Sequence, residues 1–80
     1  MNKKDKENYK QMILDHLEFK FTPTYRRYGI KLEEFLVLLS ELQNEHKIKY
    51  DIITEMLPNG NPSPFHGEPK NIRLFKDNVH

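Results

Sequence analysis

The sequence predicts a single α+β domain in which three helices precede a two-stranded antiparallel β-hairpin. Apolar residues repeat at helical spacing as far as about residue 46, and from Ile48 onward they alternate as in a strand. A chain of 80 residues suits one small domain, and it has no cysteine for a disulfide or a thiolate site. We therefore treat residues 1–80 as one domain.

The first helix is expected over about residues 5–18. Its apolar face follows helical spacing and consists of Tyr9, Met12, Ile13, His16 and Leu17. Its opposite side is expected to be solvated and carries Lys3, Lys6, Glu7 and Lys10. Two phenylalanines then alternate with Lys20, which allows a short extra strand near residues 19–21.

The second helix is expected over about residues 23–28 and is very short. Thr22 precedes Pro23, and proline is preformed for the first helical position while it moves the preceding residue out of the α region. The tyrosines of this segment are expected to face inward and its arginines outward. Gly29 ends the helix, because glycine adopts a left-handed cap without a steric penalty.

The third helix is expected over about residues 31–46. The side chains that repeat at helical spacing, and should be buried, are Leu32, Phe35, Leu36, Leu39 and Leu42, with Leu38 widening the face. The residues expected on the outward face are Glu33, Val37, Ser40, Glu41 and Asn44.

The hairpin strands are expected over about residues 48–56 and 71–76, with a proline-rich loop over residues 58–69. Proline and glycine block regular pairing in that loop, so we expect it to be mobile or folded back. Phe65 is expected to pack back on the core as a lid; insertion into a partner is the alternative.

The pattern rests on Thr22-Pro23, Tyr28-Gly29-Ile30, the pair Leu39 and Leu42, and Ile48 opening the first strand. From about Tyr9 to Lys76, it resembles the winged helix-turn-helix superfamily of small bacterial and phage regulators. Two features depart from that superfamily. His46-Lys47 stand where a glycine is common, and the loop between the strands is unusually long.

The resemblance implies a regulatory protein that binds double-stranded DNA and acts as a homodimer. The outward face of the third helix would enter the major groove, with base contacts from Ser40 and Asn44. The residues implied in phosphate contacts are Arg26, Arg27 and Lys31 at the turn and Lys70 and Arg73 beside the loop. The loop itself has no Lys or Arg, so its tip is not expected to anchor DNA.

Charge leaves a second function open. The net charge is only +1, without the basic excess usual for DNA-binding domains, and the third helix carries four glutamates. The alternative is a protein-interaction module or inhibitor that does not bind DNA. Its contact residues would be Glu33, Glu34, Val37, Glu41 and Phe65.

Catalysis and metal binding find no support in the sequence. The chain has no phosphate-binding loop, nucleophile elbow or cofactor fingerprint, so we expect no enzymatic activity, cofactor or small-molecule substrate. No ligand spacing relates His16, His46, His66 and His80, so no metal is expected. His16 and His46 are instead expected to be partly buried and bound to backbone groups.

The longest apolar run, residues 35–39, is far too short to span a bilayer. The N-terminus lacks the apolar stretch of a signal peptide. We therefore expect no membrane association and a cytoplasmic location.

Overall fold

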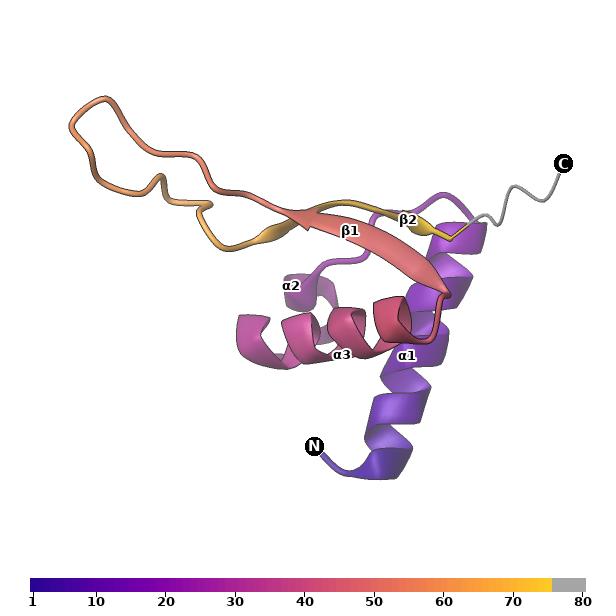
Figure 1. Ribbon diagram of the computed structural model, residues 1–80. Coiled ribbons are helices and arrows are strands. Elements are labelled where there is room, and N and C mark those ends of the chain that lie inside the picture. The colour runs from indigo at the N-terminus through magenta and orange to yellow at the C-terminus, as the bar shows by residue number, and fades with distance from the viewer. Residues whose placement is uncertain (76–80) are drawn as a thin grey trace, which may run out of the picture.

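The computed structural model describes residues 1–75 and contains three helices followed by a two-stranded antiparallel sheet (Figure 1). The elements are α1 (Lys3–Glu18), α2 (Tyr25–Tyr28), α3 (Leu32–Asn44), β1 (Ile48–Ile52) and β2 (Pro69–Leu74). The α+β class and the order of the elements are confirmed. The extra strand expected near residues 19–21 does not form in the described structure, so that expectation was wrong. No helix within residues 1–75 has the length and apolarity needed to cross a membrane.

Side-chain caps explain where α1 and α2 begin. Asn2 caps α1 by accepting a hydrogen bond from the backbone N of Asp5 at 2.8 Å, so the helix starts two residues before the expected position. Thr24 caps α2 by accepting from the backbone N of Arg27 at 3.2 Å. The expected start at Pro23 was therefore wrong, and Pro23 is buried in front of the helix instead.

Each helix is followed by a left-handed residue that reverses the chain: Lys20 (φ 62°), Gly29 (φ 68°) and His46 (φ 60°). After α1, the backbone N of Phe21 donates to the carbonyl of residue 16 at 2.8 Å. His46 thus takes the conformation usual for the missing glycine, which is why α3 ends at Asn44. Its ring is exposed, 5.9 Å from the ring of Phe75, so the expected burial was wrong.

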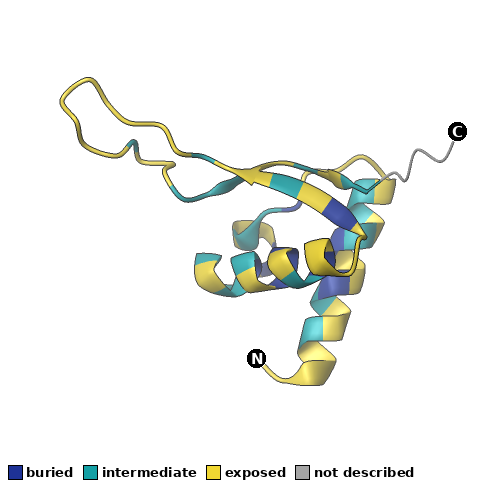
Figure 2. Ribbon diagram, viewed as in Figure 1, coloured by how far each residue is buried: buried dark blue, intermediate teal, exposed yellow. Residues whose placement is uncertain are grey.

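The core lies where the three helices meet the start of β1 (Figure 2). Its buried side chains are Ile13, Tyr28, Phe35, Leu38, Leu39, Leu42 and Ile48. The expected face of α3 is largely confirmed, although Leu38 is more deeply buried than Leu36. The expected face of α1 is also largely confirmed, except that Met12 is 39% exposed and Lys10, which was expected in solvent, is buried.

The sheet register contains a bulge. Lys49 lies opposite Arg73, and Asp51 lies opposite Lys70, so β2 has one more residue than β1 in this interval. Asn71 lies in that interval with a φ of 53°. Pro69 opens β2, a position that proline tolerates because the first residue of a strand need not donate. The predicted end of this strand at Lys76 lies outside the described residues.

The segment between the strands, residues 53–68, extends away from the helices and is called the arm below (Figure 1). Backbone hydrogen bonds continue the hairpin along it, including Ile53 N to Glu68 O at 2.9 Å and Leu57 N to Asn61 O at 2.7 Å. Phe65 is 54% exposed, so the expectation that it covers the core was wrong. Phe65 belongs to one of the two hydrogen-bonded segments of the arm, so it lies away from the helices.

The left-handed residue after α1 gives a stability prediction. A side chain with a Cβ pays about 1–2 kcal/mol in this conformation, whereas glycine does not. Lys20→Gly should therefore raise the free energy of unfolding by about 1 kcal/mol, measured by urea unfolding followed by circular dichroism. Lys20→Ala is the matched control, because alanine keeps the Cβ, and it should change stability little. Equal effects of the two substitutions would contradict this account.

Candidate functional site

Two glutamates at the C-terminal end of α3, Glu41 in the helix and Glu45 at its C-cap, are bound by lysines of α1. Lys10 Nζ lies 2.9 Å from Oε1 of Glu41 and 2.8 Å from Oε2 of Glu45. Lys6 Nζ lies 3.0 Å from the other oxygen of Glu41. The Lys10 side chain is only 7% exposed. We call these four residues the α1–α3 ion cluster.

The cluster keeps its members charged. Hydrogen bonds to Glu45 and Glu41 raise the pKa of Lys10 well above its usual range, against desolvation, which lowers it. The hydrogen bond from Lys10 is the main cause that lowers the pKa of each of these two glutamates. At neutral pH, the carboxylate of Glu41 on α3 and that of Glu45 at its C-cap are therefore paired with lysines within the molecule.

Another glutamate of α3, Glu34, takes part in a cap at the start of the helix. An Oε1 of Glu34 accepts from the backbone N of Lys31 at 3.0 Å, at the N-terminal end of the helix. A negative side chain is also favourable there because of the helix dipole. The remaining glutamate of the helix, Glu33, is exposed and has no ion pair among the described residues.

The outward stripe of α3 consequently differs from the expected face. The exposed residues that follow one another at i, i+4, i+7 and i+11 are Glu33, Val37, Ser40 and Asn44. Glu41, which was expected on that face, is turned toward α1 because Lys6 and Lys10 bind it. The stripe therefore presents one carboxylate, one apolar side chain and two neutral polar side chains.

Basic residues lie at the N-terminal end of α3. Arg26 and Arg27 are exposed on α2, and Lys31 is exposed at the cap of α3. The guanidinium of Arg26 lies 5.0 Å from the centre of the Tyr25 ring, which gives it a fixed platform. The structure thus keeps these three predicted residues in one exposed segment.

A contact between α1 and α2 holds that segment in place. The Tyr28 hydroxyl and His16 Nδ1 are 2.6 Å apart, and their rings stack at 5.5 Å. Burial raises the pKa of Tyr28 to about 12, so the hydroxyl stays protonated at neutral pH. His16 is partly buried, as expected, but it binds a side-chain hydroxyl instead of a backbone group.

The two predicted basic residues of the sheet form a separate group. The Arg73 guanidinium donates to the Asn71 carbonyl at 2.6 Å and lies 3.7 Å from a carboxylate oxygen of Asp51. Lys70 lies opposite Asp51 in the sheet register. No hydrogen bond or ion pair found in residues 1–75 connects either residue with the turn between α2 and α3.

The sequence analysis missed the ion cluster because it placed Lys6 and Lys10 in solvent. A pattern that could have revealed it is the matching separation of four residues between Lys6 and Lys10 and between Glu41 and Glu45. Residues four apart lie on the same side of a helix. Two such pairs of opposite charge can therefore meet when the helices cross.

Comparison of the chain with protein-family models, with curated proteins and with solved structures found no match. Within the part of the chain that the structure describes, no group of three or more His, Cys, Asp or Glu side chains is placed to hold a metal ion.

The ion cluster predicts a pH-dependent stability. Lys10→Met should lower the free energy of unfolding at pH 7 by about 1–3 kcal/mol, a loss moderated by the partial exposure of both carboxylates. Because the folded pKa values of Glu41 and Glu45 are lowered from 4.5, their contribution is full above that value. The contribution of the two carboxylates to stability disappears as the pH falls through their folded pKa values. The difference in the free energy of unfolding between variant and wild type should therefore shrink at acidic pH.

Urea unfolding of both proteins at pH 7 and at strongly acidic pH measures this difference. Lys4→Met is the matched control, because Lys4 is exposed on the same helix and has no ion pair in the described structure. If Lys10→Met lowered the free energy of unfolding as much in acid as at pH 7, this would contradict the role of the two carboxylates.

Proposed function

We propose that this protein is a DNA-binding regulator of the winged-helix type, in which α3 enters the major groove. The arrangement of three helices followed by a hairpin supports this proposal. The observation that carries it is that two of the three glutamates of α3, Glu34 and Glu41, and the C-cap residue Glu45 are engaged within the molecule. The outward stripe therefore brings little negative charge toward the phosphates.

The stripe has the chemistry needed to read bases. Asn44 can form two hydrogen bonds with adenine, Ser40 can donate or accept, and Val37 can contact a thymine methyl group. With 13 residues, α3 is about 20 Å long. A helix of that length can place both polar side chains within one stretch of the major groove.

The turn between α2 and α3 supplies the phosphate contacts. Arg26, Arg27 and Lys31 are exposed at the end of α3 that leads into the groove. Contacts of this kind position a protein on the duplex and make its affinity depend on salt. Lys70 and Arg73 have a secondary role in this proposal, because Asp51 lies beside both.

The proposal is tested by fluorescence anisotropy with a mixed-sequence duplex at about 50 mM salt, where phosphate contacts are strong. Arg26→Ala combined with Arg27→Ala should weaken binding at least about tenfold and reduce the salt slope by about 2. Lys3→Ala combined with Lys4→Ala removes the same charge from the exposed start of α1 and is the matched control. Equal losses in both variants, or no binding by the wild type, would refute the proposal.

A second candidate is a protein-interaction module that does not bind DNA. The observation that favours it is the exposure of Phe65 (54%) and Met56 (56%) on the arm. A partner that binds the glutamates of α3 is less well supported, because Glu34 and Glu41 already bind groups within the molecule. The anisotropy assay separates the candidates, since a module of this kind would not bind a duplex.

A further inference from the structure

One glutamate of α3 keeps a free carboxylate on the exposed stripe. Glu34 accepts a backbone hydrogen bond at the helix start, and Glu41 is bound by lysines of α1. Glu33, at the second position of the helix, is exposed and forms no ion pair or side-chain hydrogen bond among residues 1–75. Its carboxylate is therefore available to accept hydrogen bonds from another molecule.

Cations at the same end of α3 offset the repulsion between this carboxylate and the phosphates of DNA. Arg26 and Arg27 are exposed on α2, and Lys31 is exposed two positions before Glu33. Together with the carboxylates of Glu33 and Glu34, these three cations give the segment a formal charge of +1. When the cations contact the phosphates, Glu33 can therefore approach the base edges without a net repulsion at this end of the helix.

An ionised carboxylate fits only some bases in the major groove. It accepts hydrogen bonds and donates none. The donors in this groove are the amino groups of cytosine and adenine, and adenine places its N7 acceptor beside that donor. Guanine and thymine present the acceptors N7, O6 and O4, which repel a carboxylate. Cytosine is therefore the base that the side chain of Glu33 fits best.

The stripe also sets the distance between this cytosine and a second base. Asn44 lies on the same stripe and follows Glu33 by 11 residues. On an α-helix this separation is about 16 Å along the axis. Stacked bases are about 3.4 Å apart along a strand. The two side chains therefore face base pairs about five positions apart, and Asn44 fits adenine.

We propose that Glu33 is a specificity-determining residue, and that the DNA target contains a cytosine read by Glu33 about five base pairs from an adenine read by Asn44. This inference rests on the proposed function and adds the class of sequence that is bound. The carboxylate lowers the affinity for duplex DNA in general, because phosphates repel it. It lowers the affinity least where a cytosine amino group binds it, so Glu33 acts mainly by excluding other sequences.

Selection from a library of duplexes with a randomised central segment, at about 50 mM salt, tests this inference. The wild type should enrich a cytosine and an adenine at the stated separation. Glu33→Gln replaces the carboxylate with an amide of the same size, which fits adenine instead of cytosine. Its enriched sites should therefore lose the cytosine and keep the adenine read by Asn44. Asn44→Ala should show the reverse, with the cytosine kept and that adenine lost.

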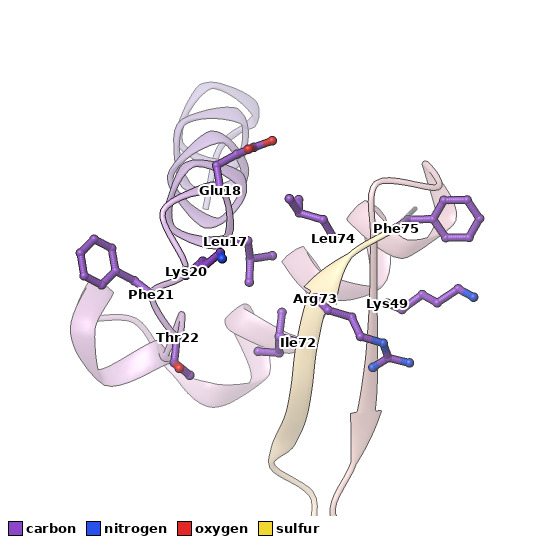
Figure 3. Close-up of a pocket in the computed structure, with 10 residues that line it drawn as sticks. All are labelled: Leu17, Glu18, Lys20, Phe21, Thr22, Lys49, Ile72, Arg73, Leu74 and Phe75. Carbon is purple, nitrogen blue, oxygen red and sulfur yellow. The ribbon is translucent and has the colours of Figure 1, made fainter. Parts of the chain in front are cut away.

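Fluorescence anisotropy with the enriched duplex measures the size of the effect. Exchange of the selected C·G pair for each of the other three pairs should weaken wild-type binding at least about fivefold. Glu33→Gln should not show this loss, and it should bind duplexes without the cytosine more tightly than the wild type. Glu18→Gln is the matched control, because Glu18 is exposed on a different helix, beside the groove between the end of α1 and β2 (Figure 3). It removes the same charge and should keep the wild-type preference.

The outcomes separate this inference from the proposed function. A wild type that binds duplex DNA without enriching the cytosine would overturn the inference and leave the proposed function standing. A cytosine preference that survives in Glu33→Gln, or that Glu18→Gln also abolishes, would do the same. Absence of binding to any duplex would refute the proposed function and the inference with it. The exchange of base pairs uses only the wild type, so it decides the matter even if circular dichroism shows that Glu33→Gln does not fold.

Discussion

The ammonium of Lys10 lies between the carboxylates of Glu41 on α3 and Glu45 at its C-cap, and the placement of that helix depends on this contact. A buried ammonium without counter-charges is strongly unfavourable, so rotations of α3 that move Glu41 and Glu45 away are penalised. Replacing such a cluster with apolar residues need not reduce stability, but it would remove this orientational constraint. The apolar residues of α3 allow several rotations, and the ion cluster favours one.

That rotation determines what α3 presents to solvent. With Glu41 turned toward α1 and Glu34 at the helix start, the outward stripe is largely neutral. The same helix therefore appears acidic in the sequence and much less so on its exposed face. Net charge is a poor guide to a binding surface when oppositely charged residues of different helices neutralise one another.

The small core explains the exposure of the arm. The hydrophobic core of the described chain consists of seven buried residues, and none of them belongs to the arm or to β2. Backbone hydrogen bonds between the two segments of the arm fix its conformation without burying its side chains. Its apolar residues and the open edge of β2 are therefore available for contacts with another molecule.

The sequence by itself determined the features that depend on local spacing and local conformation. These are the three helices, the change to strand spacing at Ile48 and the reversal at Gly29, each set by residues within a few positions. Residue type also indicated that Arg26 and Arg27 would be exposed. For such features, periodicity and backbone preference suffice.

Only the tertiary structure decided which side of each helix meets another. Lys10 pairs with residues more than 30 positions away, so no local pattern distinguishes its burial from solvation. The exposure of Phe65 likewise depends on the direction in which the paired strands carry the arm, and the unpaired edge of β2 depends on the path of residues 19–24. These outcomes follow from contacts between segments that are far apart in the sequence. Such contacts stabilise the structure only once the chain has folded.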